Sequence, residues 1–367
     1  MNINVNITVK IPKPILNIIT SINNLGIYIH YPFCIKKCFY CDFYKTTTPQ
    51  KYFEKKIIEE IKKMKEDLIK IGYQFSPVGT IYFGGGTPSL MPIHTLEKII
   101  NYINLEFETY KDIEITIEAN PESINLTYLK NLKSIGINRI SIGIQSFNIF
   151  GLRIMGRIHN PTDILQNIKI IQKCFDNYNL DFILLYPYQT IQSLKNDLKT
   201  IISITPPHLS FYMMDIDKKN LYPTTLINKI KKLHEQADKY YNLIIDQLSK
   251  TYEHYEISNF AINKLYCKHN IKYWYYGDYI GLGPSAVSKI TINQNAYRIQ
   301  NLPNNKKYTE KIDTNKQIEE KIMLGLRTKW GIIINNQQIK LNSFSNYNIQ
   351  VLEILEKSRQ TSEKFYI

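Results

Sequence analysis

Short β-rich runs alternate with amphipathic segments over the first two-thirds of this 367-residue chain. The runs carry β-branched or aromatic residues and are bounded by Gly, Pro, Asn or Asp, which is typical of strands. They are 27–30, 80–83, 114–118, 138–143, 180–185 and 208–212. The helical segments show apolar residues every three or four positions. They are 51–71, 94–105, 122–135, 161–178 and 191–204. Six β/α units in series predict a parallel sheet with helices outside it.

The pattern changes after about residue 225. A helical stretch over 225–250 precedes a segment rich in aromatics and glycine over 252–288, and the polar tail after residue 300 contains one clear helix near 318–327. We therefore expect three parts: an N-terminal extension over 1–24, an α/β core over 25–225, and a smaller, mainly α-helical domain over 226–367.

The overall composition is that of a globular protein, with 44% hydrophobic and 21% charged residues. No stretch reaches the roughly 20 consecutive apolar residues that a membrane helix needs. The N-terminus is interrupted by Lys10, Pro12, Lys13 and Pro14 and lacks the apolar core of a signal peptide. These features predict a soluble, cytoplasmic protein without stable membrane insertion.

The formal net charge of +14 permits a polyanionic partner. However, the basic residues are dispersed over most of the chain, and short runs such as 229–232 are typical of the solvated faces of helices. Charge alone therefore does not favour nucleic-acid binding, and we expect none.

Three of the five cysteines, Cys34, Cys38 and Cys41, fall within eight residues after the first predicted strand. The spacing CxxxCxxC lets one tight loop direct three thiolates towards a single metal centre. An iron–sulfur cube normally takes four cysteines, so three would leave one iron open to a ligand. A zinc site completed by Asp42 or His30 is an alternative, and a disulfide pair is less compatible with a cytoplasmic protein.

Further polar or glycine-rich positions follow the later predicted strands. The carboxyl ends of parallel strands meet at one edge of the sheet, so we expect these positions to form one site with the cysteines. Their glycines allow a ligand to approach the backbone closely, and an arginine can pair with a carboxylate through its planar fork. The positions are the run Gly84 to Pro88 (GGGTP), Glu118, Gln145, Arg157 and Asp181.

CxxxCxxC with Tyr40 before the third cysteine resembles the signature of the radical S-adenosylmethionine (SAM) superfamily. The longer string YIHYPFCxxxCxYCDF, which begins at Tyr28, is similar to the branch that holds the oxygen-independent coproporphyrinogen III oxidases and the HemW-type heme chaperones. The resemblance extends over about residues 25–332. It implies a partial (β/α)6 TIM-like barrel with a [4Fe-4S] cluster on Cys34, Cys38 and Cys41, and SAM on the open iron.

The resemblance also implies a role for each position of the site. Gly85, Gly86 and Thr87 would contact the methionine part of SAM, and Arg157 its carboxylate. Glu118 would bind the ribose or methionyl group, Gln145 would be a polar contact, and Asp181 would contact the nucleoside. Tyr28 and Tyr40 would position SAM beside the cluster.

One segment departs from the family pattern. After Asp181 the family has YGLPGQT, whereas this chain reads LLYPYQT, so Leu185 and Tyr188 replace two glycines. If those glycines allow close backbone approach, the SAM pocket is tighter or repacked here, and productive cleavage of SAM is in question.

A second motif follows in the segment 252–288. The string HNxxYW and then DYxGxGPSA resemble the region through which the HemW-type chaperones bind heme. An imidazole can ligate iron, and flat aromatic rings suit a porphyrin. The resemblance therefore implies heme contacts from His269, Asn270, Tyr273 and Trp274, with Cys267 as another possible ligand. From the residues alone, a hydrogen-bonded structural histidine and ordinary core packing of the aromatics are the favoured explanation of the string.

Two functions follow from the resemblance. The first is a heme chaperone that binds heme and passes it to an acceptor protein, for which a respiratory protein is a candidate. The expected further partners are a flavodoxin-type electron donor and a second copy of the chain in a homodimer. The second is a radical SAM oxidase that decarboxylates coproporphyrinogen III. Such oxidases usually carry a further cysteine two residues after the third, where this chain has Phe43. That difference and HNxxYW favour the chaperone.

Overall fold

The computed structural model describes residues 9–10, 12, 24–215, 222–303, 306–334 and 337–341. Most of the expected N-terminal extension and the tail after residue 341 lie outside these residues. Within them, one sheet of 12 strands has the order β13-β12-β11-β10-β2-β3-β4-β5-β6-β7-β9-β8. A smaller sheet joins β1 (Val9–Lys10), β14 (Ile332–Ile334) and β15 (Gln337–Ile339).

The central strands are the six that the sequence predicts, and each pairs in parallel with the next. They are β2 (Leu25–Tyr31), β3 (Val78–Gly85), β4 (Thr109–Ala119), β5 (Arg139–Gln145), β6 (Tyr178–Leu184) and β7 (His208–Met213). The sheet curves but does not close, since β13 and β8 are its edges. The expectation of a partial α/β barrel is therefore confirmed.

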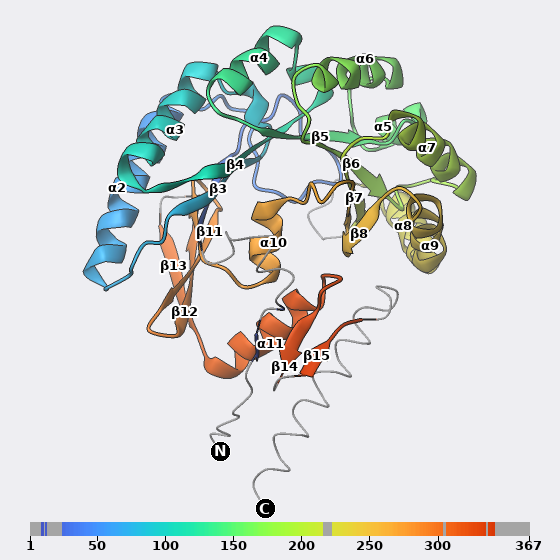
Figure 1. Ribbon diagram of the computed structural model, residues 1–367. Helices are drawn as coiled ribbons and strands as arrows, with labels where there is room; N and C mark the ends of the chain where they lie inside the picture. Colours follow the sequence, from blue (N-terminus) through green and yellow to red (C-terminus); the bar gives the residue numbers. More distant parts are fainter. Residues whose placement is uncertain are drawn as a thin grey trace, which may run out of the picture.

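The connecting helices form an arc outside the curved sheet (Figure 1). They are α2 (Phe53–Lys70), α3 (Ile93–Glu106), α4 (Leu126–Ser134), α5 (Ile149–Ile154), α6 (Pro161–Gln172) and α7 (Ile191–Ile204), with short 3-10 turns at Pro88–Leu90 and Pro121–Ser123. Helix α2 buries Ile57, Ile61 and Met64, the apolar stripe visible in the sequence. Helix α6 ends earlier than expected because β6 begins at Tyr178.

The C-terminal region contains four described helices, as its sequence suggests. They are α8 (Thr224–His234), α9 (Ala237–Leu248), α10 (Lys268–Trp274) and α11 (Thr314–Gly325). The region also adds six strands to the main sheet: β8 (Glu253–Glu256), β9 (Asn259–Ala261), β10 (Tyr279–Leu282), β11 (Val287–Ile292), β12 (Asn295–Asn301) and β13 (Lys307–Ile312). None of the described helices is long and apolar enough to cross a membrane.

The expectation of a mainly helical C-terminal region is therefore corrected. Strand β10 pairs in parallel with β2, and β11, β12 and β13 continue the sheet in antiparallel order. Outer antiparallel strands can remain polar because one face is solvated, so a lysine- and asparagine-rich sequence gives only a weak strand signal.

Helix α10 lies inside the arc of strands rather than outside it (Figure 1). The carboxylate of Glu114 on β4 accepts hydrogen bonds from the backbone N–H groups of Lys268 and His269, both at 3.1 Å. These are orphan donors at the first turn of α10. The HNxxYW segment is thus fastened to the inner face of the barrel.

Leu185 and Tyr188, which replace the family glycines, both have left-handed backbone conformations, with φ of 62° and 65°. Neither lines the cavity at the carboxyl ends of the strands. The Leu185 side chain is fully buried, whereas the Tyr188 ring is exposed and lies beneath the Lys229 ammonium, 4.3 Å from the ring centroid. Leu185 and Tyr188 therefore introduce backbone strain where the family has glycine, but their side chains do not narrow the cavity.

We expect Tyr188→Gly to raise the free energy of unfolding by up to about 1 kcal/mol. The substitution removes the strain of a left-handed non-glycine residue, which costs ~1–2 kcal/mol. It also removes the cation–π contact with Lys229, which contributes ~0.5–1 kcal/mol at an exposed site, so the net gain is smaller than the strain. Urea denaturation measures the change. The matched control is Tyr308→Gly on β13: its ring is equally exposed (58% against 59%), but its φ is not positive, so stability should fall. A loss of stability in Tyr188→Gly would contradict the argument.

Candidate functional site

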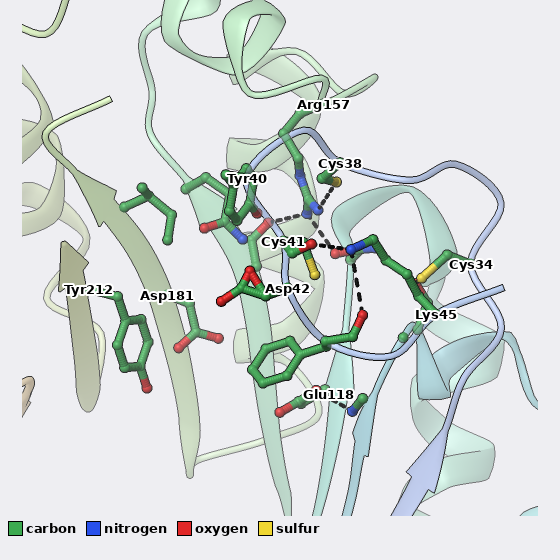
Figure 2. Close-up of a pocket in the computed structure, with 18 of the residues that line it drawn as sticks. Cys34, Cys38, Tyr40, Cys41, Asp42, Lys45, Glu118, Arg157, Asp181 and Tyr212 are labelled. Atoms are coloured by element: carbon green, nitrogen blue, oxygen red, sulfur yellow. Dashed lines mark hydrogen bonds between the residues drawn. The ribbon is translucent and has the colours of Figure 1, made fainter. Parts of the chain in front are cut away.

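One cavity of about 460 Å³ opens at the carboxyl ends of β3 to β7, beneath the loop that carries the three cysteines (Figure 2). Eleven of the twelve residues predicted to hold the cluster or SAM line it: Cys34, Cys38, Tyr40, Cys41, Gly85, Gly86, Thr87, Glu118, Gln145, Arg157 and Asp181. Its volume lies within the roughly 300–1,000 Å³ typical of small-molecule sites. The expected convergence at one edge of the sheet is thus observed.

The cysteine loop connects β2 to α2 and is pinned at both sides. Backbone hydrogen bonds join Thr46 N to Pro32 O (2.8 Å) and Cys34 N to Thr46 O (2.9 Å). On the other side, the Thr87 hydroxyl donates to Cys34 Sγ over 3.5 Å. Burial raises the pKa of the Cys34 thiol. All three cysteines are free thiols, so the disulfide alternative is not realised here.

The glycine run at the end of β3, Gly84 to Gly86, holds this loop in place. Gly86 N donates to Tyr31 O (2.7 Å), and Thr87 N donates to Phe33 O (2.9 Å). A Cβ atom at Gly86 would lie 2.7 Å from Phe33 O, so no side chain fits there. Because these N–H groups are engaged, a ligand in the cavity would meet the carbonyl side of the run rather than its N–H side.

Two half-buried carboxyl groups face the cavity from the strands. Glu118 accepts hydrogen bonds from the Tyr82 hydroxyl and from Gly85 N, both at 3.0 Å. Asp181 accepts from Ser141 at 2.8 Å and from Asn179 at 2.7 Å. Burial and the Asp181 charge raise the pKa of Glu118 to about 7, and burial likewise raises the pKa of Asp181. A cationic ligand would favour the ionised form of both.

Arg157 reaches the cavity from the segment after α5. Its guanidinium donates to Cys38 Sγ over 3.5 Å and to Gly143 O over 2.8 Å. Within the described part of the chain, Arg157 Nε and Gln145 Oε1 are buried without hydrogen-bond partners. A buried polar atom without a partner is costly. These two therefore point to a polar group that the cavity is built to receive.

Of the two predicted aromatic contacts, Tyr40 lines the cavity and Tyr28 does not. The Tyr28 ring stacks on Tyr82 with 6.1 Å between centroids, and its hydroxyl is hydrogen-bonded to His30 Nδ1 (3.1 Å). Tyr28 thus contacts the side of Tyr82 that faces away from the cavity lining and does not reach the cavity itself.

His30 is unsuited to complete a zinc site. Its Nε2 is hydrogen-bonded to Tyr44 O at 2.8 Å while Nδ1 meets Tyr28. Among the described residues, no group of three or more His, Cys, Asp or Glu side chains is placed to hold a single metal ion. The three cysteines instead surround a volume shared with the cavity.

The residues expected to contact heme lie elsewhere, on α10. His269 is completely buried: its Nδ1 is hydrogen-bonded to Thr80 (2.8 Å) and its Nε2 to Tyr273 (2.6 Å), and its ring stacks on Tyr82. Burial lowers the pKa of His269 to about 3. Its role as a heme ligand stays a prediction, and in this conformation neither ring nitrogen is available to iron.

The rest of the motif surrounds His269. Asn270 is half-buried on the same helix, and the Trp274 ring packs under Arg327, 4.5 Å from the guanidinium. Cys267 is buried beside Glu114, and its Sγ lies 3.8 Å from the carboxylate. None of these residues lines the cavity at the cysteine loop.

Two residues of the site were not singled out from the sequence. Asn120 accepts from Arg157 (2.6 Å) and donates to Thr87 (3.3 Å), so it joins the arginine to the glycine run. Tyr82 supports Glu118. Asn120 follows Glu118 by two residues at a strand end, which was an available signal, whereas Tyr82 becomes visible only once β3 and β4 are paired.

Residues 28–201 match the family model described as the radical SAM superfamily. The heme chaperone HemW of Buchnera aphidicola (from Acyrthosiphon pisum) is 37% identical over 272 residues, 73% of this chain and 70% of that protein. The heme chaperone HemW of Lactococcus lactis is 31% identical over 351 residues, 90% and 89% of the two chains. The chain belongs to the HemW family of radical SAM proteins.

The solved structure of coproporphyrinogen III oxidase (HemN) from Escherichia coli, a radical SAM enzyme, superposes with a TM-score of 0.65. It covers 94% of this chain and 83% of the oxidase at 20% identity, a likeness of fold. Membership of the radical SAM superfamily implies a [4Fe-4S] cluster and SAM.

The residues of this HemW-family chain fit both the [4Fe-4S] cluster and SAM. Three free thiols on one loop border the cavity and leave a fourth ligand to come from elsewhere. The two carboxyl groups suit the cationic sulfonium and ammonium of SAM, and the unpaired Arg157 Nε suits its carboxylate.

We expect Tyr82→Phe to weaken SAM binding several-fold near pH 7 and to move the pH midpoint of binding upward. SAM affinity should rise with pH as Glu118 ionises, with a midpoint near its pKa of about 7. Losing the Tyr82 hydrogen bond disfavours the ionised carboxylate and so raises that pKa. Asp181 and Arg139 also act on Glu118, and neither is changed by the substitution.

Calorimetric titration of SAM across pH measures this shift. Tyr28→Phe is the matched control, because that hydroxyl is hydrogen-bonded to His30 instead. Equal effects of both substitutions would contradict the role given to Tyr82.

Proposed function

We propose that this protein is a heme chaperone that carries a [4Fe-4S] cluster and SAM, binds heme and passes it to an acceptor protein. The observation that supports it most is that one cavity is lined by the three loop cysteines and by two acids and an arginine from three other segments. The heme part is supported by the relatives named heme chaperone HemW, which match 73–90% of the chain.

In this proposal, Cys34, Cys38 and Cys41 hold the cluster. When bound, the cluster would supply an electron to SAM. The chain's own residues orient SAM: Arg157 holds the carboxylate, and Glu118 and Asp181 hold the cationic and nucleoside portions. The other residues around the proposed SAM position are Gly85, Gly86, Thr87, Gln145 and Tyr40, with Tyr28 packed behind Tyr82.

The remaining parts of the proposal concern partners. The proposed partners are a heme acceptor, for which a respiratory protein is the candidate, a flavodoxin-type electron donor and a second copy of the chain in a homodimer. A cytoplasmic location suits a chaperone of this chemistry. We also propose the division of the chain at residues 24 and 225, with the later segment carrying HNxxYW.

We expect Cys38→Ala to abolish the cluster. Protein reconstituted with iron and sulfide without oxygen should bind about four iron atoms per chain, and the variant close to none, since two thiolates cannot hold a cubane in this loop. Iron analysis and electron paramagnetic resonance measure this. Cys174→Ala is the matched control, because that buried thiol does not line the cavity. A variant that keeps its cluster would refute the cysteine assignment.

We expect the purified protein to bind heme in about a one-to-one ratio and to release it to apo-acceptors, as followed by the Soret absorbance.

Phe43, which is 66% exposed at the cavity mouth, occupies the place where the oxidases usually carry a further cysteine. Conversion of coproporphyrinogen to protoporphyrinogen by the same preparation would instead establish the oxidase, and a protein that binds no heme would reject the chaperone.

A further inference from the structure

Two of the three sulfur atoms on the cysteine loop have a hydrogen-bond donor from a distant segment. The Thr87 hydroxyl donates to Cys34 Sγ and the Arg157 guanidinium donates to Cys38 Sγ, both over 3.5 Å. Donors of this kind orient the ligands of a metal and tune the metal itself. The corresponding group at Cys41 comes from within the loop.

That group is Lys45, whose side chain folds back over the turn that joins it to Cys41 (Figure 2). Its ammonium donates to the backbone carbonyl of Cys41 and, over 3.5 Å, to that of Phe43. Lys45 lines the cavity at the strand ends together with all three cysteines. Because the side chain is half-buried and bonded to the loop, its charge is held beside the cysteines instead of moving freely in solvent.

The Lys45 charge reaches two of the sulfur atoms. Burial raises the pKa of the Cys34 and Cys41 thiols, and the Lys45 ammonium acts in the opposite direction on both. Lys45 therefore attracts negative charge on this side of the loop, as Arg157 does at Cys38.

The acids of the same lining do not pair with Lys45. Four line the described part of the cavity: Asp42, Glu118, Asp181 and Asp215. Among the described residues, however, Lys45 forms no ion pair with a carboxylate. A substitution at Lys45 therefore removes one uncompensated charge and leaves the acids in place.

A fixed cation matters at this position because reduction adds charge of the opposite sign. A [4Fe-4S] cluster held by three thiolates is a net anion, and an added electron makes it more negative. The potentials of such clusters depend on net charge, on hydrogen bonds to the sulfurs and on solvent exposure. A cation that solvent screens only in part stabilises the reduced form more than the oxidised form.

We propose that Lys45 is a charge-compensating residue for the cluster: it stabilises the reduced form and so lets a weaker reductant deliver the electron. The inference rests on the proposed cluster at Cys34, Cys38 and Cys41. The electron comes from the flavodoxin-type donor, and Lys45 neither gains nor loses a proton. Whereas Arg157 is also assigned to the SAM carboxylate, Lys45 acts on the cluster alone.

A redox titration of the reconstituted full-length protein without SAM tests this role, with dithionite as the reductant and electron paramagnetic resonance as the readout. At a fixed potential, Lys45→Met should lower the ratio of reduced to oxidised cluster at least threefold, a shift of about 28 mV at 59 mV per tenfold for one electron. Lys45→Gln keeps an N–H donor without the charge and should shift the potential similarly. Lys45→Arg keeps the charge and should match the wild type.

Lys37→Met is the matched control, because Lys37 is an exposed lysine of the same loop that does not line the cavity. Its potential should stay that of the wild type. A wild-type potential in either neutral Lys45 variant, or an equal shift in Lys37→Met, overturns the role. Loss of the cluster from both neutral variants also overturns it, since Lys45 would then be a structural part of the loop. A wild-type protein that assembles no cluster rejects the proposed function itself, so the two failures are distinguishable.

Discussion

The contact between the glycine run after β3 and the loop after β2 is the constraint on which the site depends. Two backbone hydrogen bonds, from Gly86 N and Thr87 N, fasten the start of the loop. A Cβ atom at Gly86 would meet Phe33 O at 2.7 Å. The cysteines consequently stand over the ends of the strands rather than in solvent, and the carboxyl groups of β4 and β6 face the same volume.

The interior of the barrel explains why a motif associated with heme is buried. Strand β4 alternates, so Glu114 in its middle and Glu118 near its carboxyl end lie on one face, while Ile115 and Ile117 lie on the other. Glu114 caps α10, and Glu118 accepts a hydrogen bond from Tyr82, whose ring also stacks on His269. A continuous row of polar contacts therefore runs from α10 to the cavity.

The cysteine loop separates two volumes of different chemistry. Its inner side faces acids and one arginine, which suit a cationic nucleoside. Its outer side faces a second, outer cavity of about 620 Å³, which is lined by one face of α2 and by the turns that follow β10 and β12. The loop of about twenty residues that separates the two volumes is held by backbone hydrogen bonds that join Pro32 and Cys34 to Thr46.

The sequence by itself determined the six parallel strands, the helices around them and the inner cavity, because a period-2 or 3.6 pattern reports locally which face is buried. The cysteine spacing and the strand-end positions of Glu118, Gln145 and Asp181 needed only the rule that parallel strands share one edge. Tertiary structure decided what depends on contacts between distant segments: the polar edge strands β12 and β13, the burial of His269, the support from Tyr82, and the outer cavity. Residues such as Lys56 and Gly283 are more than 200 positions apart in the chain, and no local pattern records that they border the same volume.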